Sequence, residues 1–367
     1  MRIGVADVRV VLDGRHAVFP GIGRFVVDLW AALRRLEPDA VAFTPRPGTV
    51  GWVGRLDDVL AGPTRRMRTG PFMPTEQIEL PMALRAEDAD VYHSPHFGMP
   101  FATRVPVVIT VHDLFPYHDA RHARSRFTRA YYRAVLPQAV RRADRVVAVS
   151  QYTFDDLSRT FGIGPDRLRL VRHGLDHERW RRPPDADIIA VQARYRLPND
   201  YVLHVGAAKW HKNLDTVLRA LDAGTPALVC AGPTPEEVAA HADLGTCRGT
   251  VRILGRVADD DLPALYAGAS ALVVPSLYEA VSFPALEAMA VGTPVIASAA
   301  TALPETLGDT GILLDPYDVE AWRHSMTQIV ADAGGRQRLV EAGFRRVAAR
   351  DWTAAAEEYR QIYAELA

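Results

Sequence analysis

The second half of the chain alternates short apolar runs with amphipathic segments, and this alternation restricts the fold more than any other feature. The runs are YVLHVG, ALVCAG, VRILG, ALVVPS, PVIASA and ILLDP, and a segment with helical spacing follows each. Strands that are apolar without interruption are buried on both faces, as in a parallel sheet covered by helices. A repeat of roughly 20 to 30 residues per strand and helix is typical of a doubly wound α/β domain.

The first half shows the same alternation less regularly, and 367 residues exceed one ordinary core, so two domains are expected. We predict an N-terminal domain over 1–178, a charged linker with a proline pair over 179–198 and a C-terminal domain over 199–351. The last helical segment, 352–367, could pack back on the first domain. Two Rossmann-like, doubly wound parallel sheets would then face a cleft at the carboxyl ends of their strands, where ligands bind.

Composition argues against several classes of function. The net charge of −1 gives no reason to expect a nucleic-acid partner. Cys230 and Cys247 lack metal-ligand spacing and fit a reducing compartment. The first residues, MRIGVADVRVVLDG, include two aspartates, which predicts that they are not a signal peptide, and no apolar run reaches about 18 residues. We therefore expect a cytoplasmic protein without a membrane span.

One segment is strongly basic. Between Arg121 and Arg145 the chain has eight arginines and one acidic residue, Asp144. A solvated helix face is the ordinary interpretation of such a segment. The alternative is attraction to an anionic acceptor or to a membrane surface, which would place the protein peripherally at the inner face of a membrane.

Lysine is confined to a single loop. Lys209 and Lys212, in VGAAKWHKNLD, are the only lysines, and every other Lys or Arg position is arginine. The loop follows the first predicted strand of the second domain, where Gly206 allows close backbone approach and the next helix presents its amide groups. A compact ammonium group suits phosphate oxygens. We predict a diphosphate site here; the alternative is two ordinary surface lysines.

Glu279 and Glu287 stand eight residues apart in PSLYEAVSFPALEAMAVGTPV, across a strand-to-helix turn. Ser282 and Pro284 suit an N-cap and an early helical position, which places Glu287 near the start of a helix. A carboxylate there can accept hydrogen bonds from the vicinal hydroxyls of a sugar, and Glu279 would point into the cleft. The alternative is that both acids serve only the helix dipole.

Two short motifs raise the question of a metal. The aspartates at 259–261 precede a predicted helix and are expected to cap it. His93 and His96, in HSPH, have no evident third ligand. We therefore predict no metal cofactor.

Taken together, these motifs resemble a known family. VGAAKWHKNL, the stretch from LGRVADDDLPALYAG to PVIAS, and LPETLGDTGILLDP look like the donor-binding domain of glycosyltransferase family 4. GIGRFVVDL, YHSPHFGMP, VVITVHDLFP, ADRVVAVSQYT and VRHGLD fit its other domain. The resemblance covers nearly the whole chain and implies the GT-B fold with retaining, metal-independent transfer. A hexose would pass from a nucleoside diphosphate sugar, with GDP-mannose or a UDP-sugar as candidates, to a small-molecule, glycan or lipid-linked acceptor.

The resemblance also implies roles for single residues. His112 would hydrogen-bond the transferred sugar, Glu279 would lie beside it, and Lys212 would bind the diphosphate. Glu287 would hold the ribose. The other implied donor contacts are Gly23, Gly206, Lys209, the backbone of Val257, and the loop formed by Ala280, Val281, Ser282 and Phe283. On the acceptor side we place His93 and Asp113.

The chain departs from the family pattern in two loops. Ala280 and Ser282 stand where the family often has glycine, so positive φ is less available there. Ala207 and His211 stand where relatives often have arginine, and Lys209 could supply the missing charge. Two other functions stay open: a nucleotide-sugar epimerase of the same fold, which would turn over donor without acceptor, and a silent sugar-nucleotide-binding protein, which would bind donor without turnover.

Overall fold

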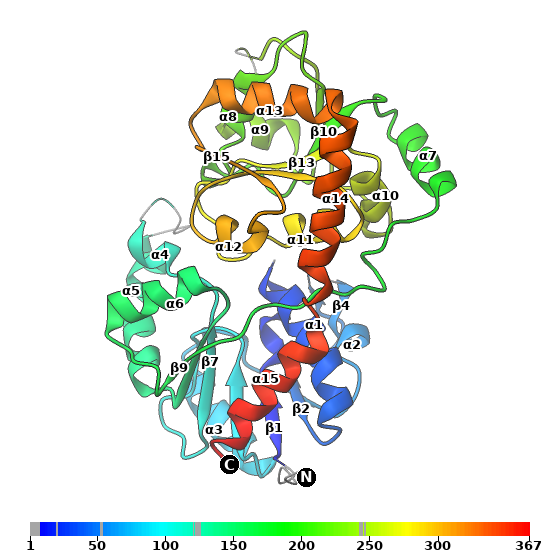
Figure 1. The fold of residues 1–367 in the computed structure, drawn as a ribbon. Coiled ribbons are helices and arrows are strands. Elements are labelled where there is room, and N and C mark those ends of the chain that lie inside the picture. The colour runs from blue at the N-terminus through cyan, green and yellow to red at the C-terminus, as the bar shows by residue number, and fades with distance from the viewer. Residues whose placement is uncertain are drawn as a thin grey trace. The chain divides into compact units, whose positions relative to one another are not determined.

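The computed structural model of the protein consists of two compact α/β units (Figure 1). Unit 1 contains the chain up to Gly174 together with Asp351–Ala367, and unit 2 contains Leu175–Arg350. The structure describes residues 8–19, 21–51, 54–119, 121, 126–241, 245 and 247–367.

Unit 1 is built on a seven-stranded parallel sheet in the order β5-β2-β1-β6-β7-β8-β9. Its strands are β1 (Val10–Leu12), β2 (Val41–Thr44), β5 (Thr64–Arg66), β6 (Val91–Ser94), β7 (Val107–Val111), β8 (Arg145–Ala148) and β9 (Leu168–Leu170). All five residues of β7 are buried, as the apolar run VVITV predicts. A separate antiparallel pair is formed by β3 (Val50–Gly51) and β4 (Gly54–Arg55).

Helices cover this sheet, and the C-terminal helix is one of them. The helices are η1 (Gly14–Val18), α1 (Ile22–Leu36), α2 (Leu56–Val59), α3 (Glu76–Ala86), α4 (Phe115–His118), α5 (Arg126–Arg142), α6 (Gln151–Phe161) and α15 (Trp352–Ala364). On α1, Phe25, Leu29 and Leu33 recur every four residues and are fully buried, so this face packs on the core. The last helix, α15, packs against α1.

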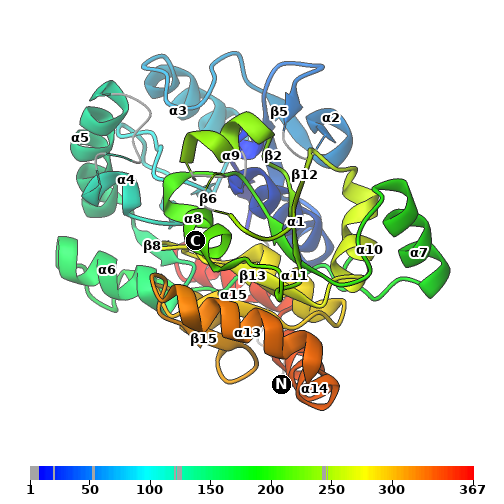
Figure 2. The same ribbon diagram turned by 90° about the horizontal axis from the view of Figure 1, so that it is seen from above.

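Unit 2 repeats the architecture with a six-stranded parallel sheet in the order β12-β11-β10-β13-β14-β15. Its strands are β10 (Tyr201–Val205), β11 (Ala227–Ala231), β12 (Val251–Gly255), β13 (Ala271–Val274), β14 (Val295–Ser298) and β15 (Ile312–Leu314). Its helices are α7 (Asp185–Arg194), η3 (Trp210–Lys212), α8 (Leu214–Ala220), α9 (Pro235–His241), η5 (Asp259–Asp261), α10 (Leu262–Ala267), α11 (Phe283–Ala290), α12 (Leu303–Leu307), α13 (Val319–Ala331) and α14 (Ala333–Ala348). The same helices are seen from above in Figure 2.

The segment predicted as a linker, 179–198, is mostly part of unit 2. Pro184 stands at the N-cap of α7, and Ile188 and Val191 on that helix join the buried core of unit 2. Trp180 is only 1% exposed and belongs to the same core. The proline pair therefore starts a helix instead of marking a break, because proline is well tolerated at helix starts.

The chain changes units at two points, between Gly174 and Leu175 and between Arg350 and Asp351. A Cβ atom on Gly174 would lie 2.3 Å from the backbone nitrogen of Trp352, so only glycine allows this approach. On the unit 2 side, the amide of Leu175 donates to the carbonyl of Arg350 at 3.0 Å. The two crossing segments therefore run side by side.

Candidate functional site

The strand order of unit 2 creates a switch point between β10 and β13. From β10 the chain moves outward to β11 and β12 and then returns to β13 on the other side of β10. The loops after β10 and β13 therefore leave the sheet in diverging directions, which opens the usual ligand position of such sheets. Lys209 and Lys212 lie in or next to the first of these loops, and Glu279 lies in the second.

An ion pair joins the two loops. The ammonium of Lys212 donates to Oε1 of Glu279 at 2.7 Å, with 23% and 12% of the two side chains exposed. The hydroxyl of Ser276 donates to the same oxygen at 2.8 Å. Oε1 thus accepts two hydrogen bonds, whereas no contact to Oε2 occurs within the part of the chain that the structure describes. The structure brings these two predicted catalytic residues together.

The turn that carries Lys212 is fixed by the residue after it. Asn213 has a φ of 53°, a left-handed conformation that asparagine adopts more readily than most residues. Its side-chain amide donates to the carbonyls of Pro275 at 3.1 Å and Pro316 at 2.7 Å. The backbone amide of Leu277 also donates to the carbonyl of His211 at 2.7 Å. The lysine loop is therefore fastened to the loop that holds Glu279.

Gly206 and Lys209 have different positions in the same loop. Gly206 directly follows β10 and has a φ of 132°, which favours glycine. Lys209 is exposed and stands at the N-cap of η3. The backbone conformation thus explains why residue 206 is a glycine. That the charge of Lys209 replaces the charge of an arginine stays a prediction.

The second glutamate of the motif is buried. Glu287 lies on α11, is 3% exposed, and accepts a 2.7 Å hydrogen bond from the hydroxyl of Tyr266 at Oε2. The loop before it needs no glycine, because neither Ala280 nor Ser282 has a positive φ. Ser282 is the N-cap of α11 and is 1% exposed.

The remaining donor-side residues of unit 2 surround this loop. Val281 packs against the core of unit 2, and Phe283 begins α11. Val257, after β12, is 8% exposed and its side chain lies in the same core. Only the backbone of Val257 is then available to a base, as its predicted role requires.

In unit 1, His112 follows β7 and its ring is oriented by a backbone contact. Nε2 lies 2.9 Å from the carbonyl of Pro95, which can only accept, so Nε2 carries the proton. Burial lowers the pKa of His112 to about 4, so the ring is neutral at pH 7. Nδ1 is then a hydrogen-bond acceptor, which suits a sugar hydroxyl, and the lowered pKa makes it a weak base.

The acceptor-side role of His93 stays a prediction, and the contacts of its side chain lie within unit 1. His93 is fully buried, with Nδ1 at 2.7 Å from the hydroxyl of Tyr363 and Nε2 at 2.8 Å from that of Thr110. Both nitrogens are therefore occupied inside unit 1. Asp113 accepts from the amide of Phe115 at 3.0 Å at the start of α4, and its acceptor role stays a prediction.

Gly23 has a packing reason to be glycine. A Cβ atom there would lie 2.5 Å from the carbonyl oxygen of Ala17, so α1 and η1 could not approach as they do. Its own amide already donates to Phe19 at 2.8 Å. A contact with donor phosphates is therefore not needed to explain this residue.

Sequence reasoning missed a buried charged cluster in unit 1. The order β2-β1-β6 makes a second switch point, and the loop after β1 carries Asp13, Arg15 and His16. Arg15 donates to both oxygens of Asp13, at 2.8 and 2.7 Å, and lies 3.5 Å from Glu76. His16 stacks on His96 with ring centroids 5.8 Å apart. The Asp-x-Arg pattern directly after a buried strand was the available signal.

Neutralising Glu76 is expected to change the pH dependence of stability. Burial raises the pKa of Glu76 to about 7, against the attraction of Arg15. Between about pH 4.5 and 7 the native state then holds a proton that the unfolded chain has lost, so stability falls as pH rises through this window. Glu76→Gln should remove this fall in the free energy of unfolding, which is of the order of 1–3 kcal/mol. Urea unfolding curves recorded across this pH range measure it.

Glu79, on the same helix, provides the matched control. Its pKa is lowered, because hydrogen bonds from Thr69 and Arg68 outweigh the opposing effect of burial. Glu79→Gln should therefore reduce stability at neutral pH and leave the fall between pH 4.5 and 7 in place. An unchanged pH profile in Glu76→Gln would contradict the buried protonated state.

The candidate metal motifs do not assemble. Asp261 pairs with Arg194 and accepts from the hydroxyl of Tyr195 at 2.8 Å, and its side chain does not cap α10, contrary to the sequence prediction. Within the described residues, no group of three or more His, Cys, Asp or Glu side chains could hold a metal ion.

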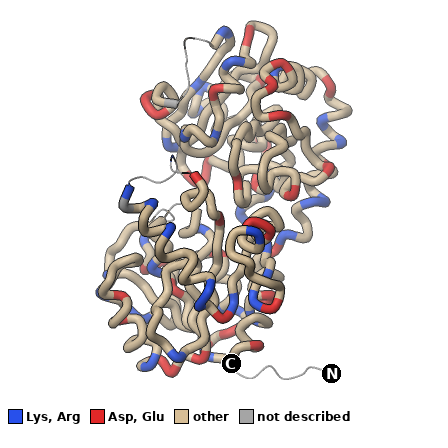
Figure 3. The backbone as a smooth tube through the Cα atoms, turned by 90° about the vertical axis from the view of Figure 1, so that its left-hand side faces the viewer, with Lys and Arg blue, Asp and Glu red and all other residues tan. Residues whose placement is uncertain are grey.

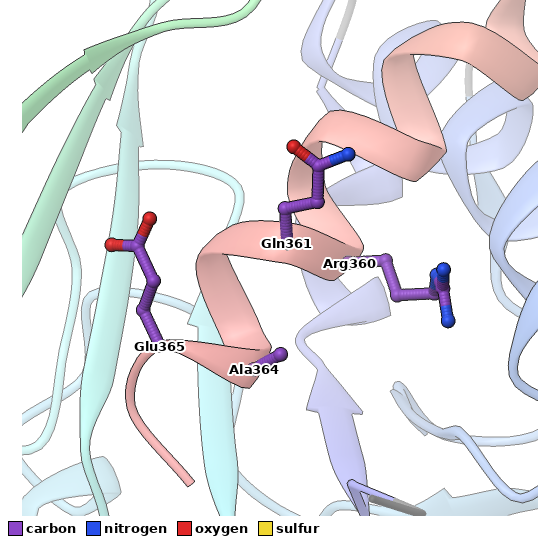
Figure 4. Close-up of a pocket in the computed structure, with 4 residues that line it drawn as sticks. All are labelled: Arg360, Gln361, Ala364 and Glu365. Carbon is purple, nitrogen blue, oxygen red and sulfur yellow. The ribbon is translucent and has the colours of Figure 1, made fainter. Parts of the chain in front are cut away.

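A pocket of about 280 Å³ lies on α15 of unit 1 (Figure 4). It is lined by Arg360, Gln361, Ala364 and Glu365 of α15. Arg360 pairs with Glu357 at 2.6 Å, and Glu365 pairs with Arg145 and Arg169 at 3.0 Å. These ion pairs account for the two charged residues of the pocket.

Two doubly wound parallel sheets place the protein in the GT-B class of folds, and comparison with known proteins agrees. Residues 19–179 match the family described as Glycosyltransferase Family 4, and residues 187–346 match Glycosyl transferases group 1. A solved sucrose-phosphate synthase from Thermosynechococcus elongatus aligns with a TM-score of 0.76 at 23% identity, over 98% of this chain and 99% of that one. Anabaena HepE in complex with UDP-glucose aligns with a TM-score of 0.78 at 18% identity, over 98% and 100%.

Relatives with assigned activities also indicate a glycosyltransferase. The chain is 30% identical to O-antigen chain mannosyltransferase B of Escherichia coli, over 74% of this chain and 73% of the relative. It is 33% identical to D-inositol 3-phosphate glycosyltransferase of Salinispora tropica, over 71% of this chain but only 59% of that relative's length. The chain belongs to glycosyltransferase family 4 and transfers a sugar from a nucleotide sugar to an acceptor. The predicted fold, family and reaction class are confirmed.

Proposed function

We propose that this enzyme is a retaining hexosyltransferase whose nucleoside diphosphate sugar binds at the switch point of unit 2. The observation that carries the proposal is the Lys212–Glu279 pair, which joins the loops after β10 and β13. The ammonium group of Lys212 contacts the motif carboxylate, next to the switch point where parallel sheets usually bind their ligands.

In the proposed reaction, the bond between the anomeric carbon and the diphosphate oxygen breaks and a bond to the acceptor oxygen forms on the same face. The acceptor proton passes to the departing phosphate oxygen. Lys212 stabilises the negative charge that develops on the diphosphate, an electrostatic contribution that is usually the largest in such catalysis. His112 accepts a hydrogen bond from the sugar and need not act as the base, since its lowered pKa makes it a weak one. No metal ion is required if cationic and amide groups hold this charge.

Two kinds of donor are supported by the comparisons. The Escherichia coli relative is named as a mannosyltransferase, which favours a mannose donor such as GDP-mannose. The solved Anabaena structure contains UDP-glucose, which favours a UDP-sugar. We propose a hexose donor of one of these two kinds, with a glycan, lipid-linked or small-molecule acceptor.

The arginines of α5 are proposed to attract an anionic acceptor or an anionic membrane surface from a cytoplasmic position. Arg126, Arg133 and Arg141 are exposed on this helix. Figure 3 shows the positions of the basic and acidic residues along the backbone in blue and red. At the ends of the basic segment, Arg121 pairs with Asp119 at 2.6 Å and Arg145 pairs with Glu365. The helix is not a membrane span, and no helix among the described residues is long and apolar enough to be one.

The proposal is tested by finding the donor and following its fate. Thermal-shift measurements with nucleoside diphosphates and nucleotide sugars should identify a ligand that raises Tm, since a ligand bound to the native state stabilises it by mass action. That donor should then be consumed with an acceptor in the presence of EDTA. Turnover of the sugar without acceptor would favour an epimerase, and binding without turnover would favour a silent binding protein. Loss of activity in EDTA that manganese restores would refute the metal-independent mechanism.

A further inference from the structure

A strained threonine lies next to the donor-site glutamate. Thr301, between β14 and α12, has a φ of 49°. This is the left-handed region that glycine and asparagine enter readily, and a β-branched residue there is a clear outlier. Such strain persists only where the surroundings enforce it, and it concentrates at functional sites. The reason for a threonine at this position must therefore lie in what its side chain does.

The hydroxyl of Thr301 clamps the backbone of Glu279. It accepts a hydrogen bond from the amide of Glu279 at 2.9 Å and donates one to the carbonyl of the same residue at 2.8 Å. The amide of Ala302 donates to that carbonyl as well, at 3.2 Å. The backbone donor and acceptor of Glu279 are thus both satisfied by two residues that lie more than twenty positions later.

The clamp belongs to a set of hydroxyl contacts that ends at the Glu279 carboxylate. β13 and β14 are neighbouring parallel strands, and their following loops leave the sheet together. Ser298 donates to the carbonyl of Ser276, and the hydroxyl of Ser276 in turn donates to Oε1 of Glu279. Backbone and carboxylate of Glu279 are therefore both held by hydroxyl groups, with the carboxylate directed at Lys212.

We propose that Thr301 is a positioning residue for the donor site, which fixes the backbone of Glu279 so that its carboxylate stays on Lys212. The effect on sugar transfer rests on the role of Glu279 given under the proposed function. Threonine is kept at a left-handed position because only a side chain with a hydroxyl can close the clamp. Glycine would fit the backbone better but could not make these contacts.

Three substitutions separate the hydroxyl from the backbone conformation. Thr301→Ser keeps the hydroxyl, Thr301→Val keeps the β-branch and the strain but loses the hydroxyl, and Thr301→Gly loses both the hydroxyl and the strain. If the hydroxyl positions Glu279, kcat should be near normal in Thr301→Ser. It should fall by about ten- to a hundredfold in both Thr301→Val and Thr301→Gly, because small displacements at a reacting centre are costly.

Stability should follow a different order from activity. Thr301→Val should lower Tm because it keeps the strain and leaves the amide of Glu279 without its partner. Thr301→Gly should unfold at a higher temperature than Thr301→Val, because it relieves the strain. If Thr301 had a merely structural role, kcat would instead change in the same order as Tm. Thr301→Gly would then be more active than Thr301→Val.

Arg196 provides the matched control. It also lies in unit 2 with a positive φ, 51°, at the end of α7, and it is exposed. Arg196→Gly should relieve the same kind of strain without changing kcat. A loss of kcat in this variant would mean that glycine substitutions in unit 2 disturb activity generally, and it would overturn the interpretation of Thr301→Gly.

Hydrogen exchange provides a readout that does not depend on transfer. The amide of Glu279 should exchange at least several-fold faster in Thr301→Val and Thr301→Gly than in the wild type or Thr301→Ser, as followed by mass spectrometry on the peptide that contains it. Unchanged exchange would overturn the clamp, and faster exchange with unchanged kcat would overturn the positioning role. If the wild type binds donor but transfers no sugar, the proposed function fails. The positioning role of Thr301 is then tested by the exchange rate of the Glu279 amide and by the affinity for the nucleoside diphosphate. If both are unchanged in Thr301→Val and Thr301→Gly, that role is refuted.

Discussion

Replacement of Lys212 with methionine is expected to lower kcat for sugar transfer by about a hundred- to a thousandfold, the usual effect of losing one group that stabilises developing negative charge. Methionine preserves much of the length and apolar stem of the side chain, so the change is mainly the loss of the ammonium group. Donor affinity should fall less than kcat, because the charge on the diphosphate grows in the transition state. Steady-state kinetics at saturating donor measure this directly.

Lys209→Met is the matched control for that experiment. Both lysines belong to the same loop, but Lys209 is exposed whereas Lys212 contacts Glu279. Lys209→Met should raise the KM for the donor and leave kcat within a few-fold, if its charge attracts the diphosphate from a distance. An equal loss of kcat in both variants would contradict the assignment of Lys212 as the group at the departing oxygen. The Lys212→Met Glu279→Gln double variant checks that an unpaired carboxylate does not cause the loss by unfolding.

Glu287→Ala should weaken binding of the nucleoside diphosphate by about 1.5–3 kcal/mol, the cost expected when a charged hydrogen-bond acceptor is removed. The corresponding change in Kd is roughly ten- to more than a hundredfold. Isothermal titration with the diphosphate that gives the largest thermal shift would measure it. The loss should appear in donor affinity more than in kcat, because the ribose does not react.

Tyr266→Phe distinguishes the hydrogen bond between Tyr266 and Glu287 from the proposed contact of Glu287 with the ribose. It removes the hydrogen bond from the Tyr266 hydroxyl to Glu287 but leaves the carboxylate in place. Affinity for the diphosphate should then stay within a few-fold of the wild-type value. If Glu287→Ala leaves the affinity unchanged, or if Tyr266→Phe weakens it as much, the ribose contact of Glu287 is refuted and its role is internal to unit 2.

The fold could be predicted because local patterns determine it. Continuous apolar runs followed by helical segments specify buried parallel strands, and both sheets have that form. Proline and charge in the segment 179–198 predict a linker, whereas the structure has most of it in unit 2, because Ile188 and Val191 provide an apolar face for α7. A local pattern with two opposite interpretations needs tertiary contacts to decide between them.

The site could be predicted only in part, because its contacts join distant segments. Lys212 and Glu279 could each be predicted as site residues from motifs, and the structure adds that their side chains form an ion pair. No motif indicates that Glu76 approaches Arg15, or that Thr301 clamps Glu279, since these partners are far apart in the sequence and meet through packing. The contact of His93 with Tyr363 could not be predicted for the same reason, because Tyr363 lies on the last helix, outside any motif around His93.

The most direct test of the central claim is the stereochemistry of the transfer. With the donor identified by thermal shift, the product's anomeric configuration can be read by NMR from the coupling of the anomeric proton. In the proposed reaction, Lys212 stabilises the departing diphosphate and the acceptor oxygen bonds to the anomeric carbon on the same face. The account therefore predicts a product with the same anomeric configuration as the donor sugar, and a product with the inverted configuration would contradict it.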